Sequence, residues 1–462
     1  MMLPRNMQPD HLREQEFDNA FALLTKLVDM GSFDAMAPSG PGTIYTTSVT
    51  IWLLVYQRMH AGASMEEAVK YFIKGPPEFC PDNKRIREKT LSNSTAAYSD
   101  GRQRLTLEVS EGFANAVTNS IIDAWPPPLG EKRAFLIDGT TIALRPTKEL
   151  LKLFPPASNQ HGEGVFPIVN LVVAHELESG CALLPQIGPM YGPEAISETG
   201  LIERCVAQLP GGSIAMSDAG FGIFIVAYKT HKLGQDFLLR MTAVRFKALR
   251  RKATLIEEGI GWTTYIHHWI PSAKERRKYP DLPADAGLDV RLHEVVVHAG
   301  LSVYLVTGLP DSATAMASLY RKRLGVEIDI ENVKLTLNAE NILATTVDMF
   351  RKELVMSMVT YNLVVQFRRQ AAEMAELPPR RLSFTKVWTT YRIFLENAMH
   401  TDPEKWRESY RTALRYAMRD KLPNRPGRNF PREAYPRKHK SSQFKKRKRP
   451  GKTDEESVQV PK

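Results

Sequence analysis

The chain has 462 residues, of which 43% are hydrophobic and 24% are charged, and its formal net charge is +11. This length accommodates two or three domains around a large core, and the composition excludes disordered, fibrous and disulfide-rich classes. No apolar run reaches the roughly 18 residues that span a bilayer, and the polar N-terminus does not fit a signal peptide. We therefore expect a cytoplasmic protein with no membrane contact.

The N-terminal region is expected to be helical. Residues 13–120 lack strand alternation and contain amphipathic runs such as FDNAFALLTKLV and TTSVTIWLLVYQRM. The Pro-rich segment WPPPLGEK follows and is typical of a domain boundary. We therefore place a helical N-terminal domain at residues 1–124 and the start of the next domain at residue 132.

Two aspartates follow short apolar runs in the second domain. AFLIDGT carries Asp138 after a buried strand, and SIAMSDAGF repeats the arrangement with Asp218. Further strands are expected at 166–175, 181–189 and 236–241, with helices at about 194–208 and 221–232. An isolated aspartate at the end of a strand is usually a turn or helix-cap residue, so each is only a candidate until a third group joins them.

The spacing Tyr-x2-Arg-x3-Glu-x6-Lys supplies that third group. On a helix, Tyr320, Arg323, Glu327 and Lys334 fall within a polar stripe about 60° wide, with apolar residues on both flanks. The alternative is a solvated face with charge pairs between successive turns. Because three carboxylates suit hard divalent cations, Asp138, Asp218 and Glu327 are candidate ligands of two Mg²⁺ ions, for which Mn²⁺ can substitute.

Residues 242–309 exceed what a minimal α/β sheet needs. Their alternating segments WTTYIHHW, DVRLHEVVVHA and LSVYLVTGL predict a β-rich insertion. After Lys334, helices are expected at about 346–372, 383–396 and 403–420. We therefore delimit a catalytic domain at 132–345 and a helical C-terminal region at 346–420.

The positive charge is concentrated in the tail, residues 421–462. Residues 421–452 hold 13 Lys and Arg against one acid and carry +12, residues 453–462 carry −2, and residues 1–420 carry only +1. The tail lacks apolar periodicity, so we expect it to be disordered until it meets a polyanion. It suits contact with a phosphate backbone, although a solubilising tail is the alternative. Its densest basic run is Lys445, Lys446, Arg447, Lys448 and Arg449.

The three cysteines, Cys80, Cys181 and Cys205, are odd in number and widely spaced. Neither a disulfide framework nor a zinc site is indicated by this spacing. We expect reduced thiols in the core.

These motifs together resemble the insertion-sequence DDE transposases of family four. The resemblance rests on DGTT at 138–141, the D-x-G-F turn at 218–221 and the signature from Tyr320 to Lys334, and it extends over most of the chain. It implies a ribonuclease-H-like α/β core with a β-rich insertion, flanked by a helical N-terminal DNA-binding region that helps bind the transposon end and by a helical C-terminal region. The chain departs from the family pattern at Leu324, where relatives commonly carry Trp.

The resemblance also implies a function and partners. The protein would cut double-stranded DNA at transposon ends and join them to target DNA, working as a homodimer beside the bacterial nucleoid. Asp138, Asp218 and Glu327 would be catalytic, Arg323 and Lys334 would hold phosphates, and Tyr320 would hydrogen-bond or stack against DNA. Trp262 and Trp269 are candidates for stacking on a displaced base, although a strand tryptophan is usually a core residue. The alternatives are a ribonuclease-H-like nuclease without strand transfer and a non-catalytic DNA-binding protein.

Overall fold

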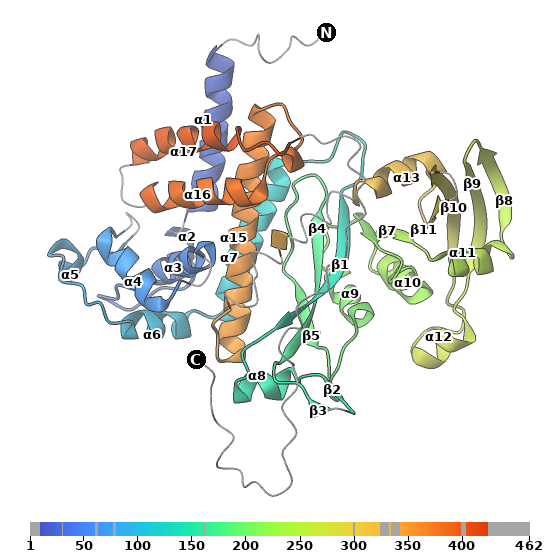
Figure 1. The fold of residues 1–462 in the computed structure, drawn as a ribbon, viewed down its shortest axis with the longest axis horizontal. Coiled ribbons are helices and arrows are strands. Elements are labelled where there is room, and N and C mark those ends of the chain that lie inside the picture. The colour runs from blue at the N-terminus through green and yellow to red at the C-terminus, as the bar shows by residue number, and fades with distance from the viewer. Residues whose placement is uncertain are drawn as a thin grey trace, which may run out of the picture.

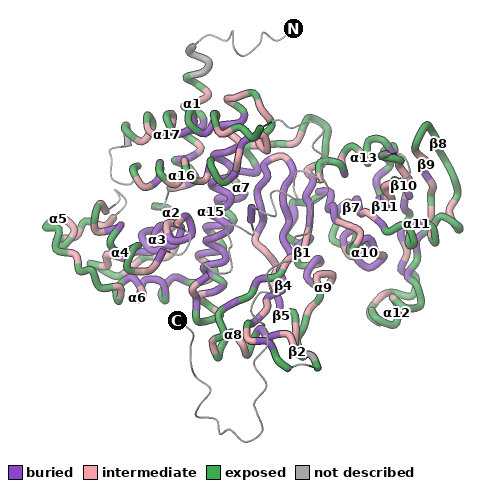
Figure 2. The backbone as a smooth tube through the Cα atoms, in the orientation of Figure 1, coloured by how far each residue is buried: buried purple, intermediate pink, exposed green. Residues whose placement is uncertain are grey.

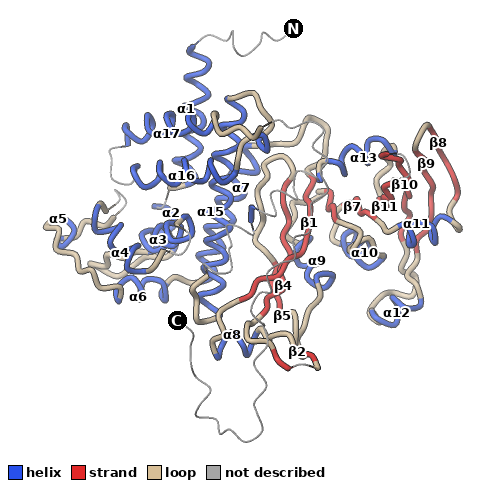
Figure 3. Tube along the Cα trace, in the orientation of Figure 1, coloured by secondary structure: helices blue, strands red, loops and turns tan. Residues whose placement is uncertain are grey.

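The computed structural model describes residues 10–29, 31–60, 63–76, 80–160, 162–298, 301–323, 332–333, 342–398 and 403–423. Within these residues, no helix combines the length and apolar character that crossing a membrane requires. The described chain divides into a helical body and a large mixed sheet with its own covering helices (Figures 1 and 3).

The helical body combines segments from both ends of the chain. The long α15 (Val347–Met374) packs against helices of the N-terminal region, and α17 packs against α1 (Figure 1). Arg407 and Arg411 of α17 form ion pairs with Asp18 of α1. The other helices of the body are α1 (Asp10–Leu27), α2 (Gly31–Met36), α3 (Thr47–Met59), α4 (Met65–Lys74), α5 (Lys84–Arg87), α6 (Ala96–Arg104), α7 (Leu107–Ala124), α16 (Phe384–Ala398) and α17 (Pro403–Ala417). Regions that the sequence separates therefore fold together.

The sheet begins with the strand order of a ribonuclease-H-like core. Antiparallel strands β1 (Ala134–Ala143), β4 (Ile168–Glu176) and β5 (Gln186–Pro189) lie on one side, and β6 (Ile214–Ser217) and β7 (Asp236–Arg240) run parallel to β1 on the other. The order across this part is β5-β4-β1-β6-β7. Helices α9 (Glu198–Val206) and α10 (Phe224–Lys232) make the crossovers that parallel strands require. The expected fold class is confirmed.

The insertion continues the same sheet. β11 (Leu301–Thr307) pairs antiparallel with β7, and β10 (Leu288–His298), β9 (Trp262–Trp269) and β8 (Thr254–Gly259) follow, giving nine strands in all. Two short helices, α11 (Ala243–Arg250) and α12 (Ala273–Lys278), interrupt its strands. Figure 2 shows the centre of the sheet buried and β8 exposed. The insertion is therefore part of one continuous sheet and is not a separate unit.

The two faces of the sheet are covered by different helices. Leu136 of β1 and Met216 of β6 form an apolar cluster with Met316 and Tyr320, which lie on α13 (Ala313–Arg321). On the opposite face, a Cβ atom added to Gly139 would meet the side chain of Glu198 at the start of α9. Alternate residues of β1 thus face α13 and α9.

The remaining small elements are α8 (Lys148–Leu153), the short hairpin β2 (Ser158–Asn159) and β3 (Gly162–Glu163), and a 3-10 helix at Pro379–Arg381.

The strand expected at 181–189 is only four residues long, because Pro185 has no N–H to donate to a ladder. Cys181 and Cys205 are buried free thiols, and Cys80 is a half-buried one.

Candidate functional site

Asp138 and Asp218 lie side by side on neighbouring parallel strands. The last paired residues of β1 and β6 are Ile137 and Ser217, so each aspartate comes directly after the pair. Both continue the alternation of Leu136 and Met216, which face α13. Neighbouring strands are about 4.8 Å apart, so the two carboxylates share one face at close range. Both side chains are half-buried.

β1 differs from expectation at Asp138. The strand was expected to end there, but it continues to Ala143, because the antiparallel ladder with β4 runs along its whole length and pairs Asp138 with Val173. Only the parallel ladder with β6 stops at the aspartate. Asp138 is therefore held within a strand, whereas Asp218 lies in the turn that follows one.

Arg240 adds a cation to this row. It ends β7, directly after Leu239, which pairs with Ser217 of β6. Leu238 belongs to the cluster under α13, so Arg240 follows on the same face as Asp218. Sequence reasoning missed this residue because the alignment of β7 with β6 is not visible in a single strand.

Tyr320 fixes α13 to the end of β6. Its hydroxyl donates a hydrogen bond to the carbonyl oxygen of Ser217 at 3.3 Å, and its ring is only 7% exposed. Burial raises the pKa of Tyr320 to about 12, an effect that neighbouring Arg323 and Arg240 oppose and Asp218 reinforces. The hydroxyl therefore stays protonated near neutral pH. Tyr320 was expected to hydrogen-bond or to stack against DNA, and the buried ring is incompatible with stacking.

The turn after β6 is held from two directions. The Asp218 carboxylate accepts a hydrogen bond from the N–H of Gly220 at 2.8 Å. A Cβ atom on Gly222 would lie 2.0 Å from the carbonyl oxygen of Arg240, so only glycine permits the turn to approach the end of β7 so closely. The D-x-G-F motif thereby brings Asp218 and Arg240 into one local structure.

A cationic side chain also braces the turn from the insertion. Arg245 of α11 donates a hydrogen bond from Nη1 to the carbonyl oxygen of Ala219 at 2.8 Å. It lines a cavity of about 840 Å³ together with the basic side chains of Lys252, Lys274 and Lys278 and an apolar floor that includes Trp269. The insertion thus places positive charge beside Asp218.

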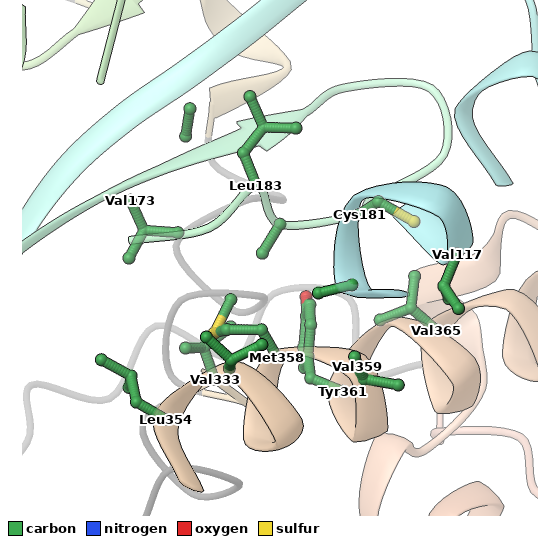
Figure 4. Packing of buried hydrophobic residues seen from close by; sticks show 14 of the residues in the cluster. Val117, Val173, Cys181, Leu183, Val333, Leu354, Met358, Val359, Tyr361 and Val365 are labelled. Atoms are coloured by element: carbon green, nitrogen blue, oxygen red, sulfur yellow. The ribbon is translucent and has the colours of Figure 1, made fainter. Parts of the chain in front are cut away.

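Glu327 and Lys334 lie outside the described residues, as do the five basic residues 445–449. α13 ends at Arg321, where the N–H of Lys322 bonds to the carbonyl oxygen of Leu319, so the described chain does not show one helix through the signature. The structure nevertheless describes residues that precede and follow Glu327 in the sequence. Arg323 lies beside Tyr320, and Val333 belongs to the same apolar cluster as Val173, the cross-strand neighbour of Asp138 (Figure 4).

The two tryptophans differ in exposure. Trp269 is 5% exposed and packs edge-on against Phe224, with ring centroids 5.6 Å apart. Trp269 therefore takes the core position that was the alternative to stacking, because stacking on a base needs an open ring face. Trp262 is half-exposed and lies across Gly259 of β8. β9 is four strands from β6 and five from β1, so Trp262 is at least about 19 Å from Asp218 and about 24 Å from Asp138.

The donor chemistry fits divalent cations. Carboxylates are the preferred ligands of Mg²⁺, and Asp138 and Asp218 present two of them on one face. Among the described residues, no group of three or more acidic, histidine or cysteine side chains could hold a metal on its own. The site needs a further ligand, and Glu327 is the acid that the sequence offers.

The chain was compared with known protein families, curated proteins and solved structures. The family described as "Transposase DDE domain" matches residues 129–363, a span that contains Asp138, Asp218 and Glu327. No curated protein matches the chain. Among solved structures, the chain is similar to a piggyBac transposase synaptic complex with hairpin DNA, at 10% identity and a TM-score of 0.38, over 84% of this chain and 78% of that one.

Proposed function

We propose a catalytic site on the premise that the chain belongs to the transposase DDE domain family, whose members cut DNA and join the cut ends to new DNA. Its function as a DNA transposase follows from that membership, as does a need for divalent metal ions. The finer proposal is that Asp138, Asp218 and Glu327 are the three catalytic carboxylates. The observation that carries it is the row of Asp138 and Asp218 on the face that α13 covers.

The three carboxylates would together hold two Mg²⁺ ions. When bound, such ions increase the nucleophilicity of the attacking oxygen and neutralise charge on the leaving oxygen. The protein fixes the ligands in advance: Asp138 lies within the ladder with β4, one residue past the end of the ladder with β6, and Asp218 is held by Gly220 and the Tyr320–Ser217 contact. This rigidity favours an in-line displacement because little rearrangement remains to be made.

The same site would serve two successive displacements. In the first, a water oxygen forms a bond to phosphorus, the bond to the 3′ oxygen breaks, and that oxygen takes a proton. In the second, the freed 3′ hydroxyl loses its proton and attacks another phosphodiester, releasing a different 3′ oxygen. Arg240, Arg323 and Lys334 would bind the phosphate oxygens, and Tyr320 would act as a positioning residue through Ser217.

Several finer features extend the proposal. The Tyr320–Lys334 signature supports membership of insertion-sequence family four. Because a transposase acts on two transposon ends, we expect it to bind double-stranded DNA as a homodimer. We expect this to take place in the bacterial cytoplasm. The basic run 445–449 would contact the phosphate backbone. Trp262 remains a candidate for stacking on a base some distance from the cut.

The decisive experiment is cleavage by Glu327→Gln. A duplex that carries the end of the element is incubated with purified protein and Mg²⁺, and the products are resolved on a denaturing gel. The variant should bind the duplex normally and cut it at least about a thousandfold more slowly, because it loses a metal ligand at constant shape. Glu258→Gln, an exposed substitution on β8, is the matched control and should cut normally.

The same assay separates the alternatives. Joining of the cut end to a second duplex distinguishes a transposase from a ribonuclease-H-like nuclease. Binding by the unmodified protein without any metal-dependent cutting would instead favour a non-catalytic DNA-binding protein. If Glu327→Gln lost DNA binding together with cleavage, the residue would be structural and the assignment would be wrong.

A further inference from the structure

The end of α13 is held on two sides. Tyr320 reaches the carbonyl oxygen of Ser217 at the end of β6. Lys322 follows α13 with helical torsion angles, φ −58° and ψ −21°. Its Nζ lies 3.2 Å from Oε1 of Glu178 and 3.9 Å from Oε2 of Glu131. Successive residues of a helix are about 100° apart, so Tyr320 and Lys322 project from nearly opposite sides of α13.

Glu178 lies in the tight turn that follows β4. The turn closes where the N–H of Gly180 donates to the carbonyl oxygen of Glu176 at 2.9 Å, and the hydroxyl of Tyr361 on α15 donates to the carbonyl oxygen of Gly180 at 3.2 Å. Buried Ser179 donates its N–H to the carboxylate of Glu176. Because these bonds fix the backbone on both sides of Glu178, its carboxylate gives the lysine a fixed point of attachment.

Glu131 approaches the same lysine from the segment that precedes β1. Two residues later, Nη1 of Arg133 lies 3.2 Å from the buried carboxylate of Glu176 at the end of β4. This ion pair joins the segment before β1 to the turn after β4. Lys322 therefore attaches α13 to the end of the sheet where β1 begins, whereas Tyr320 attaches α13 to the end where β6 stops.

The two attachments fix how α13 is rotated about its own axis. Arg323 comes three positions after Tyr320, on the same side of the helix, and lies beside it. A rotation of about 10° would move a side chain at the helix surface, about 6 Å from the axis, by about 1 Å. A misplacement of about 1 Å can slow an enzymatic reaction by about 100-fold. A contact that resists this rotation can therefore matter more for catalysis than for stability.

We propose that Lys322 is a positioning residue for Arg323. The inference rests on the proposed function, in which Arg323 binds a phosphate oxygen at the catalytic row. The side chains of Lys322 and Glu178 are 44% and 27% exposed, and an ion pair as exposed as this contributes little to folding stability. Its effect is on the orientation of Arg323, and so on the rate at which bound DNA is cut.

Cleavage of the element's end by the full chain tests this role. Lys322→Met keeps the length and apolar stem of the side chain and removes its charge. It should slow cleavage at saturating DNA about tenfold, which corresponds to a displacement of Arg323 by about half an ångström. The DNA concentration for half-maximal cleavage should not change, and the midpoint of thermal unfolding should shift by at most about 2 °C. Lys322→Arg keeps the charge and should restore most of the rate.

A double-mutant cycle with Glu178 identifies the partner. Glu178→Gln removes the same ion pair and should slow cleavage by a similar factor, and the double variant should be no slower than either single variant. Losses that multiply in the double variant would overturn the proposal, because the two residues would then act separately. An increased DNA requirement in Lys322→Met, together with normal cleavage by Glu178→Gln, would also overturn it, since Lys322 would then contact DNA directly.

Lys229→Met is the matched control. Lys229 of α10 pairs with Glu203 of α9 at similar exposures, 37% and 46%, and its replacement should leave cleavage unchanged. Arg323→Gln separates this inference from the proposed function. If Arg323→Gln cuts normally, the proposed role of Arg323 fails and this inference fails with it. If Arg323→Gln cuts slowly while Lys322→Met cuts at the normal rate, only the positioning role of Lys322 is wrong.

Discussion

Replacing Arg240 with Met should affect DNA cleavage and metal binding in opposite directions. Arg240 lies one strand from Asp218 on the same face, so under the proposed assignment its guanidinium would repel a divalent cation bound to Asp218 and attract the reacting phosphate. Met keeps the length and apolar character of the side chain and removes the charge. The substitution should therefore slow cleavage yet lower the Mg²⁺ concentration at which cleavage is half-maximal.

The magnitudes follow from the spacing. At about 6 Å and an effective dielectric constant of about 20, a unit charge and a divalent ion repel by roughly 5 kcal/mol, and solvent around half-exposed groups reduces this to about 1 kcal/mol. We therefore expect the half-saturating Mg²⁺ concentration to fall about fivefold. Loss of a charged hydrogen bond to phosphate costs about 1.5–3 kcal/mol, which corresponds to cleavage slower by roughly 10- to 150-fold.

The assay is the initial rate of end cleavage across a range of Mg²⁺ concentrations at fixed ionic strength. Arg291→Met is the matched control, since Arg291 is a half-buried arginine on β10, two strands from β7. It should change neither the cleavage rate nor the half-saturating Mg²⁺ concentration. An unchanged cleavage rate in Arg240→Met, or a slower rate with an increased Mg²⁺ requirement, would refute the role we assign to Arg240.

Three further predictions concern other parts of the chain. Removing residues 433–462 should weaken DNA binding and make the binding constant less dependent on salt concentration, because phosphate contacts are lost. A binding titration at several salt concentrations measures this dependence. An unchanged slope would exclude the tail from the DNA interface. Tyr320→Phe should lower the free energy of unfolding by about 1 kcal/mol, measured in urea, because the hydrogen bond to Ser217 is lost. The matched control Tyr416→Phe, at an exposed tyrosine of α17, should leave it unchanged. Burial lowers the pKa of His293 to about 4, so as the pH falls this histidine takes up a proton in the unfolded chain before it does so in the folded one. Its contribution to the free energy of unfolding should therefore be fully present above pH 6.5 and be lost progressively towards pH 4. His293→Gln should reduce this loss, measured by thermal unfolding at several pH values.

Local patterns in the sequence were sufficient to find the two aspartates. Asp138 and Asp218 each follow an apolar run that forms a buried strand, and a buried strand is visible within a few residues of sequence. Their adjacency depends on the parallel register of β1 with β6, which no single strand encodes. For the same reason the sequence alone did not reveal Arg240, because its position beside Asp218 depends on the register of β7 with β6.

Pairing between distant segments was the part that sequence could not supply. The alternation of β9, β10 and β11 indicated strands but did not indicate that β11 would pair with β7. Alternation also left open which face of β9 is buried, so Trp269 was a candidate for stacking until its contact with Phe224 was seen. Arg102 of α6 and Glu353 of α15 form a buried ion pair although they are 251 positions apart in the sequence. The residues around each of them show no local pattern that predicts burial.

The continuity of the sheet has a consequence for protein engineering and for the evolution of the insertion. β7 is hydrogen-bonded on both sides, to β6 and to β11, and the pair Arg240–Leu305 is part of the second ladder. An insertion taken from a relative cannot be exchanged as an independent cassette, because a shift of one residue in β11 would turn its alternate side chains to the opposite face. Variation in length should instead be tolerated at β8, the exposed outer edge, where no further strand of the described chain depends on the register.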